Sequence, residues 1–123
     1  MKKLLILLFI LISFDTFAVE KETTFTSEVF NEAQKAGKTV VINSWNKTCS
    51  ICSAQIKVLQ EAEKEFNDVL FLSFEQTKNK DIAKFLNIDF WTTIVVYKNK
   101  AEVARIIGQT DKSLIYSTIK KGI

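Results

Sequence analysis

The sequence of 123 residues contains no histidine, no proline and only two cysteines, Cys49 and Cys52. A structural zinc site normally takes four ligands, drawn mostly from cysteine and histidine. One chain with two cysteines and no histidine does not meet that requirement. The lack of histidine also leaves Lys47 and the end of a helix as the groups that could stabilise a cysteine thiolate.

The sequence also lacks an apolar run long enough to span a bilayer. The run from Leu4 to Phe14 has 11 residues and ends at Asp15, whereas a membrane-spanning helix needs about 20. Lys2 and Lys3 precede the run, and Thr16-Phe17-Ala18 offers small residues at the −3 and −1 positions of a cleavage site. This order is typical of a secretory signal peptide, and an uncleaved membrane anchor is the alternative.

We therefore predict a signal peptide over residues 1–18 and one domain over residues 19–123, periplasmic or secreted after cleavage. The composition, 47% hydrophobic and 25% charged, is that of a globular protein. The net charge of +3 is too small to indicate a nucleic-acid partner. An exported protein meets an oxidising compartment, so a reductase there needs an external reducing partner.

Both cysteines lie in the stretch Trp45–Cys52, which follows the apolar run Thr39–Ile42 and precedes a helical pattern over Ser53–Phe66. We expect a buried strand, a short loop and a helix that Cys49 opens. A thiol at a helix N-terminus lies near the positive end of the helix dipole, which lowers its pKa. Cys52 lies one turn later, within reach of a disulfide to Cys49. One thiol can then attack a disulfide while the other resolves the product.

The other elements alternate between helix and strand. We predict a first helix capped by Thr26 or Ser27 and stopped by Gly37, and a last helix capped by Thr110 or Asp111. A helix is also expected over Thr77–Asn87, and strands over Thr39–Trp45, Val69–Phe74, Thr93–Tyr97 and Ala101–Ile107, with a hairpin turn at Asn99-Lys100. Right-handed parallel crossovers and a closing hairpin should connect the strands. Each helix should bury one apolar stripe against the sheet. In chain order, the four stripes are Val29, Phe30 and Ala33; Ile51, Val58, Leu59, Ala62 and Phe66; Ile82, Phe85 and Leu86; and Leu114, Ile115 and Ile119.

The stretch Trp45–Cys52 resembles the active site of the thioredoxin family, in which a strand is followed by a Trp, three residues, Cys-x-x-Cys and a helix. The order of the predicted elements resembles that family's fold. The resemblance implies an α/β thioredoxin-like fold, with a central mixed sheet of four or five strands flanked by helices. It implies a thiol–disulfide oxidoreductase in which Cys49 attacks, Cys52 resolves, and Trp45, Trp91 and Thr92 line the substrate surface. Its substrates would be protein disulfides or thiols, with a redox partner such as a membrane electron donor. We expect no cofactor and no resident metal.

Several positions depart from the family's pattern. Thr92 stands where thioredoxins carry a cis-proline facing the cysteines, so the Trp91–Thr92 bond should be either trans or a strained cis bond. Asn43 and Ser73 stand where the family often has a buried Asp and its Lys partner, which leaves water or Glu75 to carry protons. The Ser50-Ile51 pair does not settle the direction of exchange, and the overall pattern favours reduction. The alternatives are a metal or iron–sulfur carrier joining two chains, and a binding module stapled by a structural disulfide.

Overall fold

The computed structural model describes residues 22–123, so the predicted signal peptide lies outside the described residues. The elements follow the order α1 (Ser27–Lys35), β1 (Thr39–Trp45), α2 (Ser50–Glu65), β2 (Val69–Glu75), α3 (Lys80–Phe85), β3 (Thr93–Lys98), β4 (Ala101–Ile107) and α4 (Lys112–Lys120). Within residues 22–123, no helix combines the length and the apolar character needed to cross a membrane.

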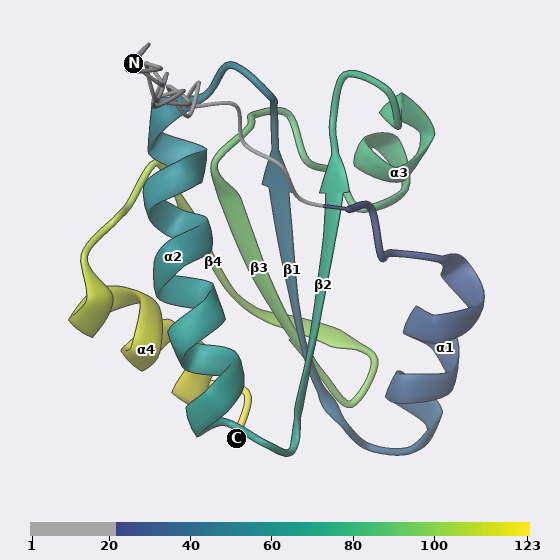
Figure 1. The fold of residues 1–123 in the computed structure, drawn as a ribbon. Coiled ribbons are helices and arrows are strands. Elements are labelled where there is room, and N and C mark those ends of the chain that lie inside the picture. Colours follow the sequence, from purple (N-terminus) through teal and green to yellow (C-terminus); the bar gives the residue numbers. More distant parts are fainter. Residues whose placement is uncertain (1–21) are drawn as a thin grey trace, which may run out of the picture.

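The strands form one mixed sheet in the order β2-β1-β3-β4 (Figure 1). Strand β1 is central, parallel to β2 and antiparallel to β3, and β4 is antiparallel to β3. All seven residues of β1 are buried, as its continuous apolar run predicted. The predicted α/β architecture, a central mixed sheet flanked by helices, is confirmed, with four strands among the described residues.

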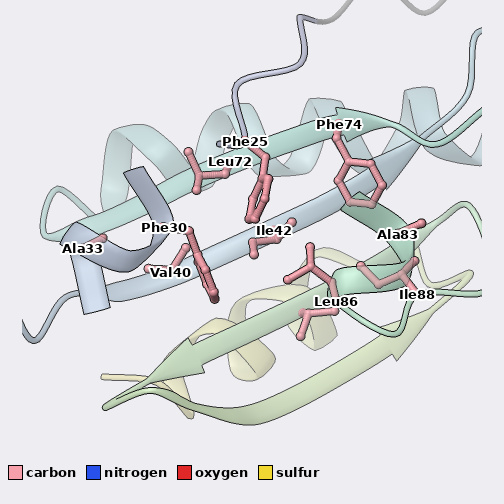
Figure 2. Packing of buried hydrophobic residues seen from close by; sticks show 11 residues of the cluster. Phe25, Phe30, Ala33, Val40, Ile42, Leu72, Phe74, Ala83, Leu86 and Ile88 are labelled. Atoms are coloured by element: carbon pink, nitrogen blue, oxygen red, sulfur yellow. The ribbon is translucent and has the colours of Figure 1, made fainter. Parts of the chain in front are cut away.

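The sheet is covered on both faces. Helices α1 and α3 pack on one face, where Phe30 and Leu86 meet Ile42 and Phe74 (Figure 2). Helices α2 and α4 pack on the other, where the cluster consists of Val41, Leu59, Ala62, Ile94, Val96, Ile115 and Ile119. Full burial of each large apolar side chain stabilises the fold by about 1.5–3 kcal/mol, so the two clusters fix the sheet between its helices.

The prediction that all crossovers are parallel is wrong for the second one. The connection through α2 joins the parallel strands β1 and β2, but β3 runs opposite to both. Helix α3 has six residues and is about 9 Å long, whereas a seven-residue strand spans about 23 Å. The chain therefore turns where β2 finishes, and β3 begins at that same end of the strands and runs in the opposite direction (Figure 1).

Four side chains predicted to point inward are exposed: Val29, Ile51, Phe85 and Leu114. Helix α3 begins at Lys80, later than predicted, because the preceding residues form a turn. In that turn the Thr77 hydroxyl donates a hydrogen bond to the Glu75 carboxylate, and the Asn79 side-chain amide donates one to the Glu75 carbonyl. Phe85 lies at its last residue, 57% exposed, and rests against the rings of Phe25 and Phe30. The other three helices bury narrower stripes than predicted, so apolar residues beside each stripe remain accessible.

The predicted turns and caps are confirmed. Asn99 and Lys100 both have positive φ, 51° and 66°, the backbone of a two-residue hairpin that usually contains glycine. Thr26 Oγ1 accepts the Val29 N–H at 3.1 Å, and an Asp111 carboxylate oxygen accepts the Leu114 N–H at 2.8 Å. These contacts fix the ends of α1 and α4.

Candidate active site

The site lies at the edge of the sheet where β1 and β2 end and where β3 and α2 begin (Figure 1). The loop between β1 and α2 is held by Asn46, whose Oδ1 accepts the Thr48 N–H at 3.0 Å and its hydroxyl at 2.9 Å. The amide of Asn46 donates to Glu75 Oε1 and Thr77 Oγ1, each at 3.2 Å. The conformation that presents Cys49 is therefore tied to the end of β2.

Cys49 and Cys52 form a disulfide with a Cα–Cα distance of 5.2 Å. Cys49 caps α2, as predicted: its Sγ accepts the Cys52 N–H at 3.1 Å. Cys52 is 0% exposed and packs with Trp45 and Ile56, whereas Cys49 is only partly buried. Of the two sulfur-bearing side chains, only that of Cys49 can meet another molecule without a rearrangement.

A groove of about 520 Å³ begins at Cys49. The loop before β3 forms one wall, and the end of β4 forms another. Its lining consists of Cys49, Ile51, Asp89, Phe90, Trp91, Thr92 and Ile107. Four of these side chains are large, apolar and exposed: Ile51, Phe90, Trp91 and Ile107. The groove can therefore bury apolar surface of a bound molecule beside the disulfide.

Thr92 has an unusual backbone. No cis peptide bond occurs among residues 22–123, so the Trp91–Thr92 bond is trans, and Thr92 instead adopts φ 64°. A β-branched residue rarely enters this left-handed region, which costs free energy. The Thr92 N–H donates to the Ser44 carbonyl at 3.0 Å, and the Thr92 carbonyl accepts the Gly108 N–H at 3.0 Å. These bonds hold the loop next to the cysteines.

The structure separates the three residues predicted to contact substrate. Trp91 is 42% exposed and lines the groove together with Thr92. Trp45 is 3% exposed and lies beside Cys52, and it is not part of the groove lining. Contact of substrate with each of them stays a prediction.

Among the buried polar residues near the site, Asn43 and Ser73 have no acidic group and Glu75 has a carboxyl group. Asn43 is 1% exposed, its amide donates to the Ser44 carbonyl at 3.4 Å, and its Oδ1 has no partner among the described residues. The Ser73 hydroxyl donates to the Glu22 carbonyl at 2.9 Å. Glu75 is 5% exposed and its Oε1 is bound by Asn46 and Thr77. Glu75 thus takes part in holding the active-site loop.

Gln55 is a buried residue that the predicted apolar stripe of α2 omitted. It is 0% exposed, and its Nε2 donates to the carbonyls of Thr92 and Gln109, each at 2.9 Å. Helical spacing could have indicated its burial, because Gln55 lies three residues after Cys52 and four before Leu59, on the inward face. Among residues 22–123, no group of three Cys, Asp or Glu side chains could hold a metal ion.

An α/β fold of this topology, with an accessible Cys-x-x-Cys disulfide at the start of α2, defines a thioredoxin-like redox protein. Comparison with known proteins agrees: the family model for thioredoxin matches residues 17–121. The thioredoxin of Mycoplasma genitalium is 34% identical over 84 residues, which cover 68% of this chain and 82% of the relative. An H-type thioredoxin of Fagopyrum esculentum is 28% identical over 90 residues, covering 73% and 78%.

Solved structures support the fold. Trxlp from Edwardsiella tarda superposes with a TM-score of 0.73 at 22% identity, over 77% of this chain and 94% of that one. The thioredoxin of Fasciola hepatica gives 0.70 at 22% identity, over 78% and 89%. The chain belongs to the thioredoxin family and is a thiol–disulfide oxidoreductase with a Cys-x-x-Cys site. Thioredoxins act on protein thiols or disulfides.

Proposed function

We propose that this protein is an exported disulfide reductase that attacks disulfides of other proteins through Cys49. The observation that carries this proposal is the asymmetry of the two cysteines. Cys49 is partly exposed at the N-terminus of α2 and borders the groove, whereas Cys52 is 0% exposed beneath it. The Cys52 N–H that now donates to Cys49 Sγ also stabilises a thiolate at that position after reduction.

The reaction proceeds in two exchanges. The Cys49 thiolate attacks one substrate sulfur, a mixed disulfide forms, and the other substrate sulfur leaves as a thiolate. The thiolate of Cys52 then attacks Cys49 Sγ, which re-forms the Cys49–Cys52 bond and releases the second substrate thiol. The substrate gains two electrons and this protein loses two. An external dithiol donor, such as one held by a membrane protein, must return them before the next cycle.

Substrate binding is assigned to the groove. Its exposed apolar side chains, Trp91 among them, can bury part of a substrate chain next to its disulfide. The main-chain N–H and C=O of Trp91 make no hydrogen bond within residues 22–123. Free main-chain groups of this kind can pair with an extended peptide. Thr92 fixes this backbone, and Trp45 supports the disulfide from below.

Export and direction rest on separate observations. Export rests on the basic residues Lys2 and Lys3, the apolar run after them and the small residues before Val19. The reductive direction rests on the relatives, which are thioredoxins. A reductase in an oxidising compartment depends on the external donor named above, because its surroundings would otherwise keep the Cys49–Cys52 pair oxidised.

Trapping experiments test the roles of the two thiols. Cys52→Ser removes the resolving thiol, so this variant should accumulate a mixed disulfide with a protein substrate, seen as a shift on non-reducing gels. Cys49→Ser is the matched control and should accumulate none, because Cys52 is buried. Equal trapping by the two variants would show that the thiols are equivalent and would refute the proposed mechanism.

A further inference from the structure

Gln55 places a primary amide in a fully buried position of the helix that carries the cysteines. It is 0% exposed, and both of its hydrogen bonds run from Nε2 to main-chain carbonyls. Its Oε1 has no partner among the described residues. Burying an amide costs free energy unless it is hydrogen-bonded. The two bonds from Nε2 offset part of that cost and fix the position of the side chain.

One of the two carbonyls belongs to a residue that lines the groove, and the other lies two residues after Ile107, which also lines it. One is that of Thr92, immediately before β3, and the other is that of Gln109, just after β4. The Thr92 carbonyl also accepts the Gly108 N–H at 3.0 Å. One side chain of α2 therefore joins the cysteine-bearing helix to both loops at fixed distances.

The Thr92 loop needs such support. With φ 64°, Thr92 lies in a backbone region that a β-branched residue occupies only where its surroundings over-determine it. Three hydrogen bonds do so: its N–H to the Ser44 carbonyl, and its carbonyl to the Gly108 N–H and to Gln55 Nε2. The next residue back is Trp91, whose main-chain groups make no hydrogen bond within residues 22–123 and whose side chain lines the groove.

We propose that Gln55 is a positioning residue for disulfide exchange with protein substrates. By holding the Thr92 and Gln109 carbonyls, it sets where the main chain of Trp91 lies relative to Cys49. It acts through Thr92 and not on the reacting sulfur atoms. The inference rests on the proposed function and adds a determinant of selectivity for polypeptide disulfides over small ones.

The test compares two substrates in a Gln55→Met variant, which keeps the length of the side chain and removes its donors. Insulin presents a disulfide within a polypeptide that pairs with the groove, whereas hydroxyethyl disulfide presents no backbone. With dithiothreitol as donor, kcat/KM for insulin should fall about tenfold, mainly through KM, because a displaced binding backbone loses productive geometry. The rate with hydroxyethyl disulfide should change less than about twofold.

Gln60→Met is the matched control, because Gln60 is exposed on the same helix, and it should leave both rates unchanged. A Gln55→Met variant with the parent's insulin KM would overturn the proposal. So would an equal loss with both substrates, which would indicate general damage to the helix. If the parent itself reduces neither substrate, the proposed function fails; if the parent is active and selectivity is unaltered, only this inference fails.

A measurement on the parent protein covers the case in which Gln55→Met does not fold. In a ¹⁵N-labelled sample, the side-chain amide protons of Gln55 should exchange with solvent at least about tenfold more slowly than those of Gln60. The Gly108 amide proton, which shares the Thr92 carbonyl, should be protected as well. Rapid exchange at Gln55 would show that the two bonds do not persist in solution, and the proposal would be wrong.

Discussion

Replacing Thr92 by proline would restore the residue that thioredoxins carry at this position, and we expect it to destabilise this chain. Proline fixes φ near −65°, whereas Thr92 has φ 64°. Proline also has no N–H to donate to the Ser44 carbonyl, which accepts that bond at 3.0 Å. The loop must therefore leave its present conformation in the Thr92→Pro variant.

The size of the effect follows from the bonds at this residue. Three hydrogen bonds are lost or weakened, those to Ser44, Gly108 and Gln55, at roughly 1 kcal/mol each. Leaving the left-handed region returns about 1 kcal/mol. The net loss is about 2 kcal/mol, which lowers Tm by roughly 10 °C in a domain of about 100 residues.

Urea unfolding of the oxidised protein, followed by circular dichroism, measures this loss. Thr92→Ala is the control: it keeps the N–H and the positive φ, so its free energy of unfolding should stay within about 1 kcal/mol of the parent's. A Thr92→Pro variant as stable as the parent would refute the reasoning, because the loop would then accept a second geometry at no cost.

Three further predictions concern the rest of the chain. Burial, with a smaller contribution from Glu102, raises the pKa of Tyr97 above 10. Because folding then favours the neutral phenol, the free energy of unfolding should fall as pH rises from 10 towards the folded-state pKa. The fall should be smaller in the Tyr97→Phe variant, which has no phenol to titrate. Asn43→Asp buries a carboxylate whose pKa burial raises, so its destabilisation should be absent below about pH 4 and grow above it in pH-dependent urea unfolding. Mass spectrometry of the protein from its native cell should show an N-terminus at Val19; intact Met1 in a cytoplasmic fraction would contradict export.

The sequence was most informative where local rules decide the structure. The bounds of β1 and β4 were predicted to the residue, because a continuous apolar run and clear turn signals delimit them. The direction of β3 was not, because it depends on how far α3 can carry the chain back along the sheet. Phe85 was assigned to the core from its spacing, and only the packing of α1 and α3 places it at the surface.

In the active site, too, the local sequence predicts some features and not those that depend on distant contacts. The disulfide and the capping position of Cys49 follow from four consecutive residues and a helical pattern. The conformation of Thr92 and its contact with Gln55 do not, because the bonds from Gln55 join residues 37 and 54 positions apart in the chain. Local propensity disfavours a left-handed threonine, and only these distant contacts make it stable.

The reduction potential of the Cys49–Cys52 pair tests the central claim most directly. The protein would be equilibrated with dithiothreitol at defined ratios of reduced to oxidised form, and the free thiols would be counted after acid quenching. An oxidoreductase that cycles its disulfide should titrate reversibly at a potential above about −300 mV. A potential below about −300 mV, with no exchange with added thiols, would identify a structural staple and contradict the account.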